Sequence, residues 1–316
     1  MKKTAFLLIP ILLLILVCSC ELAYDAPKVG KMHILVYGND YAGTSNKLTK
    51  TINDAVQVGN ALVKLSEKAD ISYDITYLIG PTTTYNSSAL EEDQVINDVS
   101  KERLLDTLTS VTASETDITI VYLSGHGFSD VGLNKKVLYG TDTSALTYFA
   151  ANETSSYGSA YTLVSISDLK AKICAISGTK ILISDFCYSG GFVQSDYVSV
   201  TQGDYTYLSL NDLYVDSDKI DDAAASLDLD SVFYLTAARY NQKSYEKLPL
   251  HGNFTAALLE ALGWDEDSQS LTTAMAQKNN MITLFNVARY CSKNDRESMQ
   301  TPMLSGGSND VILFSF

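Results

Sequence analysis

The sequence predicts an α/β fold in three layers, with a mostly parallel central sheet and helices on both of its faces. Short apolar runs without polar alternation recur at intervals of roughly forty residues, which is typical of strands buried on both faces. Amphipathic helical patterns lie between them, and this alternation of strand and helix favours right-handed crossovers in one open sheet. With 316 residues and 46% hydrophobic content, the chain can bury a large core.

The predicted strands are apolar runs of four to six residues. Because a strand that is covered on both faces has no solvated side, such runs need not alternate with polar residues. Five runs follow one another along the chain and a sixth closes it: His33–Tyr37, Ile75–Ile79, Ile118–Leu123, Lys180–Ile183, Val232–Leu235 and Val311–Phe314.

Helical patterns occupy stretches between and after these runs. In the first two helices the apolar residues gather on one face, as expected for a helix packed against a sheet. Ser100, followed by Glu102 in the first turn, is a typical helix cap. The five predicted helices are Thr51–Lys64, Ser100–Val111, Ile166–Ile176, Phe254–Leu262 and Ile282–Ser292.

Two segments are expected to be surface insertions rather than core. Gly140–Tyr161 is rich in Ser, Thr, Tyr, Ala and Gly, and Asn211–Asp230 contains seven aspartates with one lysine. The aspartates could bind calcium, but their spacing lacks the glycine and the terminal glutamate of an EF-hand loop. A solvated acidic loop is the favoured interpretation.

The N-terminus has the features of a secretion signal. A basic start precedes an apolar run that ends at Val17, which is too short to span a bilayer comfortably. The ending Val17-Cys18-Ser19-Cys20 resembles the lipobox of bacterial lipoproteins, whose thiol is acylated after cleavage. The resemblance implies that residues 1–19 are removed and that Cys20 carries a lipid. Residues 20–31 would then tether a domain at 32–316 to a bacterial membrane, in the periplasm or at the cell surface. An ordinary cleaved signal and an uncleaved anchor helix are the alternatives.

Charge and cysteine content limit the possible partners. Loss of Lys2 and Lys3 with the signal changes the formal net charge from −14 to −16. Such a surface repels nucleic acid and anionic headgroups, so nucleic acid is not an expected partner. The remaining cysteines are Cys174, Cys187 and Cys291, an odd number, so at least one stays free or pairs with another molecule. Without a CxxC pair, and with three histidines, no zinc site is expected.

Two of the predicted strands end in sequences with reactive side chains. Ser124-Gly125-His126-Gly127 follows one strand, and Asp185-Phe186-Cys187-Tyr188-Ser189-Gly190 follows another. The carboxyl ends of the strands line the ligand crevice in open α/β sheets. If the two strands are neighbours, about 4.8 Å apart, the imidazole and the thiol can flank one bound amide.

These residue types suit nucleophilic catalysis. A thiolate would attack, and His126 would take its proton or supply one to the leaving amine. The amide groups of Gly127 and Cys187 could stabilise an oxyanion. Strand alternation places Ser124 on the face of His126 and Asp185 on that of Cys187, which favours a pocket for Arg or Lys before the cleaved bond. Each residue alone has a structural explanation, as a buried thiol, a structural imidazole or a capping carboxylate. Their joint occurrence at glycine-bracketed strand ends favours catalysis.

The Ser-Gly-His-Gly and Asp-Phe-Cys-Tyr-Ser-Gly sequences resemble those of the caspase and metacaspase superfamily of cysteine peptidases. Caspases have a Q-A-C-[RQG]-G motif with the histidine about 50 residues upstream. Here His126 and Cys187 are 61 residues apart, and the local motif is similar to the Asp-x-Cys-x-Ser-Gly form of metacaspases and bacterial relatives. Asp185 stands where caspases have glutamine, which argues against their preference for Asp before the scissile bond. The resemblance implies a three-layer caspase-like fold.

The likeness covers nearly the whole mature chain. It implies a large-subunit-like part at 32–210 and a small-subunit-like part at 231–316, joined by an acidic connection at 211–230. It also implies that Asp54, Ser124 and Asp185 form the basic-residue pocket and that His251 is structural. The further matching stretches are Gly38–Tyr41, Leu48, Asn53–Ala55, Asp142, Val164–Leu169, Thr236–Ala238, Gln242, Ser244–Glu246, His251–Thr255 and Gln300–Pro302.

The sequence thus predicts a cysteine-type endopeptidase acting through a thioester on Cys187, with proteins or peptides as substrates. The chemistry needs no cofactor, and calcium is open only as an activator. Self-processing at Lys219 is a further hypothesis. One alternative is a non-catalytic surface lipoprotein that uses the fold as a binding module. A nucleotide-binding domain is disfavoured because no GxGxxG or GxxxxGK sequence follows a strand.

Overall fold

The central sheet has seven strands among the residues that the computed structural model describes, which are 29–42, 44–80, 94–129, 147–151, 162–192, 232–239, 241–246, 249–294, 299–306 and 311–316. Neighbouring strands are parallel except β14, which runs antiparallel to β9. In sheet order the strands are β14 (Met303–Ser305), β9 (Val232–Thr236), β8 (Thr179–Asp185), β4 (Ile118–Ser124), β1 (Lys31–Gly38), β2 (Ser72–Ile79) and β3 (Val95–Ile96). The mostly parallel sheet predicted from the sequence is confirmed.

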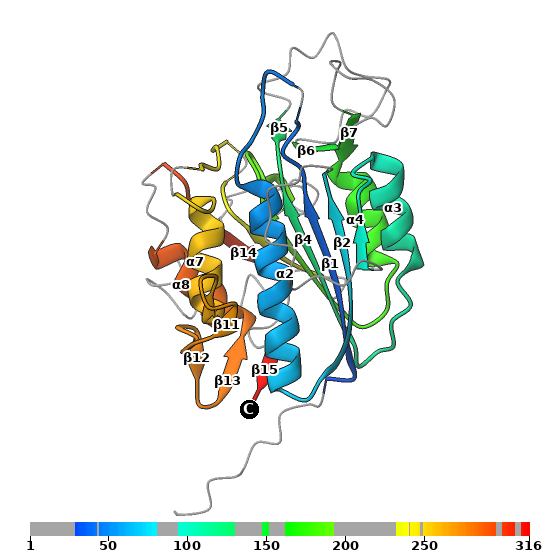
Figure 1. Cartoon of the computed structure of the whole chain (residues 1–316). Coiled ribbons are helices and arrows are strands. Elements are labelled where there is room, and N and C mark those ends of the chain that lie inside the picture. The colour runs from blue at the N-terminus through cyan, green and yellow to red at the C-terminus, as the bar shows by residue number, and fades with distance from the viewer. Residues whose placement is uncertain are drawn as a thin grey trace, which may run out of the picture.

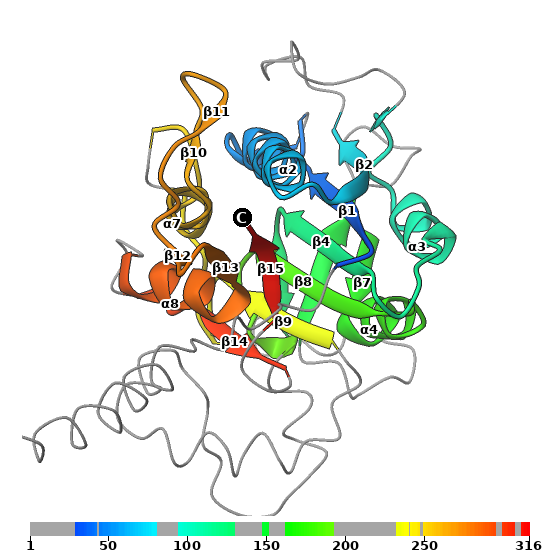
Figure 2. The same ribbon diagram turned by 90° about the horizontal axis from the view of Figure 1, so that it is seen from below.

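Helices cover both faces of this sheet (Figures 1 and 2). One face carries α2 (Thr51–Lys68), α7 (Asn253–Leu262) and α8 (Leu284–Asn294), and the other carries α3 (Lys101–Ser110) and α4 (Ile166–Cys174). The arrangement is the predicted three-layer α/β fold.

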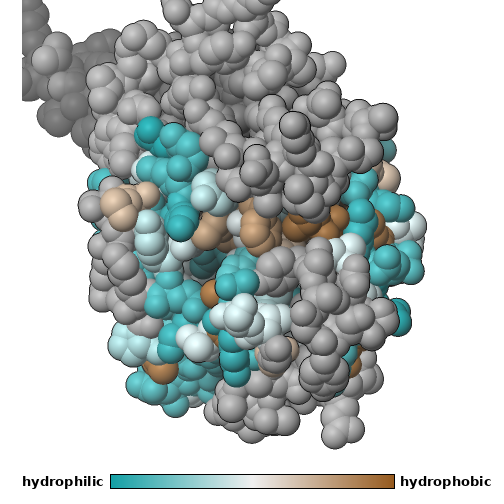
Figure 3. All heavy atoms as spheres, turned by 90° about the horizontal axis from the view of Figure 1, so that it is seen from above, coloured by the Kyte–Doolittle hydropathy of each residue, from teal (hydrophilic) through white to brown (hydrophobic). Residues whose placement is uncertain are grey.

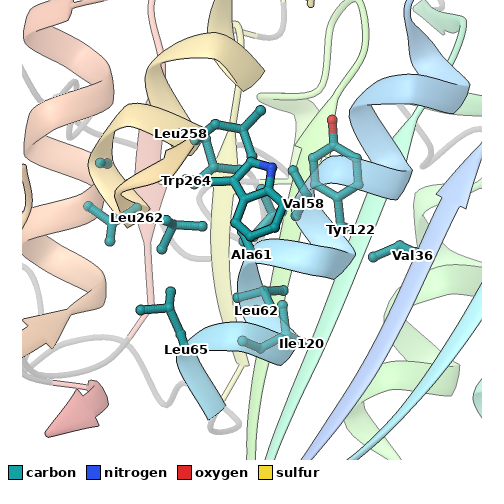
Figure 4. Packing of buried hydrophobic residues seen from close by; sticks show 14 of the residues in the cluster. Val36, Val58, Ala61, Leu62, Leu65, Ile120, Tyr122, Leu258, Leu262 and Trp264 are labelled. Carbon is teal, nitrogen blue, oxygen red and sulfur yellow. The ribbon is translucent and has the colours of Figure 1, made fainter. Parts of the chain in front are cut away.

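The buried side chains explain why the strand sequences do not alternate. In β1, Ile34 and Val36 pack into the cluster under α2 and α7, whereas Leu35 and Tyr37 point to the opposite face and pack with α3 and α4. Figure 4 shows the first cluster, in which Trp264 lies among side chains of α2 and α7. Its indole Nε1 donates to Gln57 Oε1 at 2.9 Å, so the ring is buried with its polar group satisfied.

Most predicted boundaries agree with the structure to within a few residues. Five predicted strands lie inside observed ones, and α2 begins at Thr51 as expected but continues to Lys68. The cap of α3 is confirmed, because the Ser100 hydroxyl accepts a hydrogen bond from the Arg103 amide at 3.2 Å. The closing strand, β15 (Ile312–Ser315), starts one residue later than predicted.

Two predictions about elements differ from the structure, because the start of one predicted helix is shifted by two residues and one segment is wrongly expected to be a loop. The helix expected from Ile282 begins only at Leu284, because Met281–Thr283 forms β13, which pairs with β15 in a small sheet with β12 (Gln277–Lys278). Short apolar runs fit helix and strand periods equally well. The second error concerns Gly140–Tyr161, expected to be surface loop. Its described part is β6 (Thr147–Ala151), where Phe149 is fully buried between β5 (Gly127–Ser129) and β7 (Thr162–Ser165).

Other predictions fall on residues outside the described ranges. They are the signal at 1–19, most of the tether at 20–31 including Cys20, the acidic connection at 211–230 with Lys219, and Asp142. A two-stranded hairpin, β10 (Trp264–Asp265) with β11 (Ser270–Leu271), completes the described elements. No helix in the described part of the chain has the length and apolarity needed to cross a membrane.

Candidate active site

The two sequences that carry reactive side chains leave the sheet at the same edge. Strands β4 and β8 are parallel neighbours, and Ser124 lies opposite Asp185 in their register. One further hydrogen bond, from the Gly125 amide to the Asp185 carbonyl at 3.4 Å, extends the pairing beyond the strands. His126 and Cys187 therefore follow adjacent strand ends, as the sequence predicted. Figure 3 shows the molecule from above, on this side.

The backbone of Gly127 runs directly against that of Cys187. A Cβ atom built on Gly127 would overlap the Cys187 carbonyl oxygen and the Phe186 ring, so only glycine fits here. The turn after the cysteine is held from the other side, because the Tyr188 amide donates to the Gln242 carbonyl at 2.7 Å. Tyr188 itself has a φ of 64°, a left-handed conformation that is uncommon for a residue with a side chain.

The imidazole of His126 is oriented by two contacts. Its Nε2 lies 2.6 Å from the Asn46 carbonyl oxygen, which can only accept, so the proton of the neutral ring resides on Nε2 and the lone pair on Nδ1. The ring of Tyr41 packs at 4.5 Å between centroids, and the Tyr41 hydroxyl accepts from the His126 amide at 2.7 Å. Burial lowers the pKa of His126, and the bond to Asn46 opposes this only in part. The imidazole is therefore neutral at neutral pH.

Cys187 is half-buried, and its thiol lies 3.7 Å from the Ser244 carbonyl oxygen as a weak donor. Burial raises the pKa of this thiol, while the bond to Ser244 and the charge of Lys243 act in the opposite direction. Both shifts favour the uncharged forms of the thiol and the imidazole in the free site.

A pocket of about 120 Å³ brings both groups together with three acidic side chains. The predicted residues Asp54, Ser124, His126, Asp185 and Cys187 all line it. It is completed by Leu48, Thr51, Gly125, Phe186, Ser244, Tyr245, Glu246 and Gly252.

Two of the carboxylates are deeply buried and face each other across Gly252. A Cβ atom on Gly252 would lie 2.8 Å from Asp185 Oδ2 and 3.3 Å from Asp54 Oδ2. Asp185 accepts hydrogen bonds from the hydroxyls of Ser244 at 2.5 Å and Thr255 at 2.6 Å. Burial raises the pKa of both carboxyl groups, that of Asp54 to about 7, because a negative charge is costly away from water and the hydrogen bonds that they accept offset this only in part. A cation entering the pocket would remove this cost.

Comparison with known proteins agrees with this geometry. A family model described as the caspase domain, of the C14 peptidases, matches residues 31–310. This chain belongs to the caspase domain family. The crystal structure of protein GSU0716 from Geobacter sulfurreducens has the same fold, with a TM-score of 0.52 at 14% identity, over 90% of this chain and 97% of that one. No curated protein matches the sequence.

The caspase domain also supplies pocket residues that sequence reasoning did not assign. Glu246 is a third carboxylate in the pocket, and it accepts from the backbone amides of Thr49 and Lys50, both at 3.2 Å. Burial raises the pKa of Glu246 as well. In the sequence, Ser244–Glu246 stands out only by its resemblance to the family, and no local pattern indicates that it lines the same pocket as Asp54.

The other two histidines are not part of the pocket lining. His251 shares a hydrogen bond of 2.8 Å between its Nδ1 and Asp54 Oδ1, and its expected structural role stays a prediction. His33 lies at the opposite end of β1, paired with Asp74 at 2.9 Å and near Asp117 at 3.4 Å. In the described part of the chain no cluster of three or more His, Cys, Asp or Glu side chains could hold a metal ion.

No disulfide joins the three described cysteines. Cys174 ends α4 and Cys291 lies within α8, and these helices cover opposite faces of the sheet. This placement separates the two thiols, so oxidative pairing between them is incompatible with the fold.

Proposed function

We propose that this chain is a cysteine endopeptidase that cleaves peptide bonds after Arg or Lys, with Cys187 as nucleophile and His126 as base. Membership of the caspase domain family supports the reaction class. The observation that carries the proposal is the pocket that holds the thiol, the imidazole and three buried or half-buried carboxylates within one volume of about 120 Å³.

Acylation would begin with transfer of the thiol proton to Nδ1 of His126 as sulfur attacks the scissile carbonyl. The bond from Nε2 to the Asn46 carbonyl stabilises the imidazolium that forms. The chain approaches itself closely where Gly127 meets Cys187, and the backbone amides of these two residues would donate to the developing oxyanion. The imidazolium then protonates the leaving amine, and the C–N bond breaks to give a thioester on Cys187.

Deacylation reverses these roles. His126, neutral again, would remove a proton from water as the water oxygen attacks the thioester carbonyl. The same two amides stabilise the second oxyanion. The C–S bond then breaks, and the departing sulfur of Cys187 takes the proton back from His126. The enzyme returns to its neutral pair without any cofactor.

The carboxylates select the residue before the cleaved bond. Asp54, Asp185 and Glu246 line the pocket and no Lys or Arg is among its described lining residues, so an Arg or Lys side chain of the substrate would gain a charge-assisted hydrogen bond there. An Asp side chain would add a further acidic group to this pocket and be excluded. Ser124, buried at the end of β4, supplies a hydroxyl beside them.

Fluorogenic peptides that differ only in Arg, Lys or Asp at this position test the proposal. The full chain should cleave the Arg and Lys peptides and not the Asp peptide. Cys187→Ala and His126→Ala should each lower kcat/KM by at least about a thousandfold, with Cys174→Ala as a matched thiol control of full activity. Preference for the Asp peptide would overturn the pocket, and an active Cys187→Ala variant would overturn the nucleophile.

Localisation is a separate part of the proposal. The sequence Val17-Cys18-Ser19-Cys20 supports export and attachment to a bacterial membrane through a lipid on Cys20. Radiolabelled palmitate supplied to expressing bacteria should enter the wild type and Cys18→Ser but not Cys20→Ser. Equal labelling of all three proteins would refute the anchor.

Calcium as an activator stays a prediction, checked by titrating calcium into the peptide assay.

A further inference from the structure

A chain of ionisable groups runs from the pocket toward the surface behind Asp54. His251, 8% exposed, lies between two carboxylates, with Nδ1 2.8 Å from Asp54 Oδ1 and Nε2 2.8 Å from Glu266 Oε2. Glu266 is itself held by Asn53, whose amide donates to Glu266 Oε1 at 2.9 Å. Asp54 and Asn53 are consecutive residues of α2, so one helix turn fixes both ends of the chain.

This chain is not needed to shape the pocket wall, because neither His251 nor Glu266 lines it. The Gly252 amide already donates to both oxygens of Asp54, at 3.3 and 3.2 Å, and so restrains the carboxylate without help. An imidazole between two carboxylates therefore needs another explanation. Charge provides one.

Asp54 and His251 compete for one proton near neutral pH. Burial raises the pKa of Asp54 to about 7 despite the ion pair. Burial acts to lower the pKa of His251, but its hydrogen bond to Asp54 and the negative charges of Asp54 and Glu266 together raise it above the usual value. For the same number of bound protons, the pair can be a carboxylate with an imidazolium or a carboxylic acid with a neutral imidazole. Only the first presents a charge to the pocket.

Glu266 distinguishes these two arrangements. Its carboxylate contacts the far nitrogen of His251, so its negative charge stabilises the imidazolium more than the neutral ring. We propose that His251 and Glu266 are positioning residues that hold the shared proton on the imidazole, so that Asp54 offers a negative charge to the basic side chain of the substrate.

The surroundings of His251 support this direction of the bias. The ionisable groups that face it are Asp54 from α2, Glu266 after β10 and Asp185 at the end of β8, all of them acidic. Tyr122 from β4 and Glu246 lie beyond these carboxyl groups. The Lys50 ammonium donates to the Pro249 carbonyl, two residues before His251. Three acids around one imidazole favour its charged form.

The inference rests on the proposed preference for Arg or Lys, and the test separates the two. The probes are matched peptides with Arg or with citrulline, its uncharged isostere, before the cleaved bond. The variants are Glu266→Gln, His251→Asn and the conservative Glu266→Asp. Asp267→Asn is the control, because it removes one charge at the adjacent exposed position.

For Glu266→Gln, kcat/KM for the Arg peptide divided by kcat/KM for the citrulline peptide should fall about tenfold at pH 6.5. In the pH profile of this ratio, the midpoint of the decline at acid pH should move up by about one pH unit. The loss should appear in KM, with kcat changed less than about threefold. His251→Asn should show a larger loss, Glu266→Asp should retain most of the ratio, and Asp267→Asn should match the wild type.

Several outcomes overturn the inference alone. One is that both Glu266→Gln and His251→Asn keep the wild-type ratio of kcat/KM for Arg over citrulline and the wild-type pH profile of that ratio. Another is an equal loss on both peptides, which would indicate a structural role only. Should His251→Asn not fold, Glu266→Gln decides, because its side chain is 24% exposed. If the wild type cleaves neither Arg nor Lys peptides, the proposed function fails and the inference fails with it.

Discussion

Replacement of Asp185 by asparagine should separate activity from stability. Asp185 is 6% exposed, and its two oxygens accept from Ser244 and Thr255. Asparagine has the same shape, and its oxygen can still accept from one hydroxyl while its amide donates to the other. The variant therefore loses a charge and little else.

The expected loss of activity follows from the number of carboxylates in the pocket. Removing one partner of a buried charge pair costs about 2–5 kcal/mol. Because Asp54 and Glu246 remain, we expect the lower half of this range, about 2–3.5 kcal/mol, so kcat/KM for an Arg peptide should fall about 30- to 400-fold. The loss should be in KM, since Asp185 contacts the substrate side chain and not the reacting carbonyl.

Stability should change in the opposite direction. Burial raises the pKa of Asp185 above its usual value, despite the two hydroxyl bonds, so the ionised form is less stable in the folded state than in the unfolded chain. A raised carboxyl pKa means that stability is lost as pH rises above the unfolded value of about 4 and through the folded value. Asp185→Asn removes this cost and should gain stability relative to the wild type as pH rises toward 8.

The assay combines peptide cleavage with thermal unfolding at pH 5 and pH 8. Asp74→Asn is the control, because it removes one charge at the opposite end of the sheet, where Asp74 is half-exposed. The expected result is a Tm at pH 8 equal to or above that of the wild type, with greatly reduced cleavage. Full activity, or a Tm at pH 8 clearly below that of the wild type, would refute the reasoning.

Two further substitutions test how the site is held together. Gly127→Ala places a methyl group against the Cys187 carbonyl, so it should reduce activity at least about a hundredfold and the free energy of unfolding by about 1–3 kcal/mol. Gly80→Ala is the control, because its new methyl group would make only ordinary contacts and should change neither quantity. Peptide cleavage and urea unfolding measure both effects, and a fully active Gly127→Ala would contradict the close approach. Tyr41→Phe removes a hydroxyl that accepts from the His126 amide and donates to the Ala150 carbonyl, both at 2.7 Å. It should cost about 2 kcal/mol in unfolding and lower kcat more than it raises KM, and unchanged kcat would show that His126 is positioned without it.

The sheet was predictable because its strands are buried on both faces, which leaves an apolar signature in the sequence itself. Strand β6 was not, because Tyr148 and Phe149 stand in a stretch otherwise rich in small and polar residues. Their burial comes from pairing with β5 and β7, which no local pattern encodes. The same is true of β14, three residues whose strand state depends on β9.

The site divides in the same way. His126 and Cys187 could be brought together in advance because parallel neighbours end at one edge of a sheet. The placement of Glu246, Thr255 and His251 could not, because they come from a loop and a helix far along the chain. Their proximity to Asp54 and Asp185 depends on how α7 packs beside α2, which is a tertiary property.

The central claim, a reactive thiol paired with His126 beside a basic-residue pocket, is tested most directly by covalent labelling and intact mass. A peptidyl chloromethyl ketone that ends in Arg should alkylate the Cys187 sulfur with loss of HCl, which adds the mass of one inhibitor less HCl to the wild type. The addition should be much slower in His126→Ala and absent in Cys187→Ala. The analogue that ends in Asp should leave the wild type unlabelled. Equal labelling of Cys187→Ala, or faster labelling by the Asp reagent, would contradict the account.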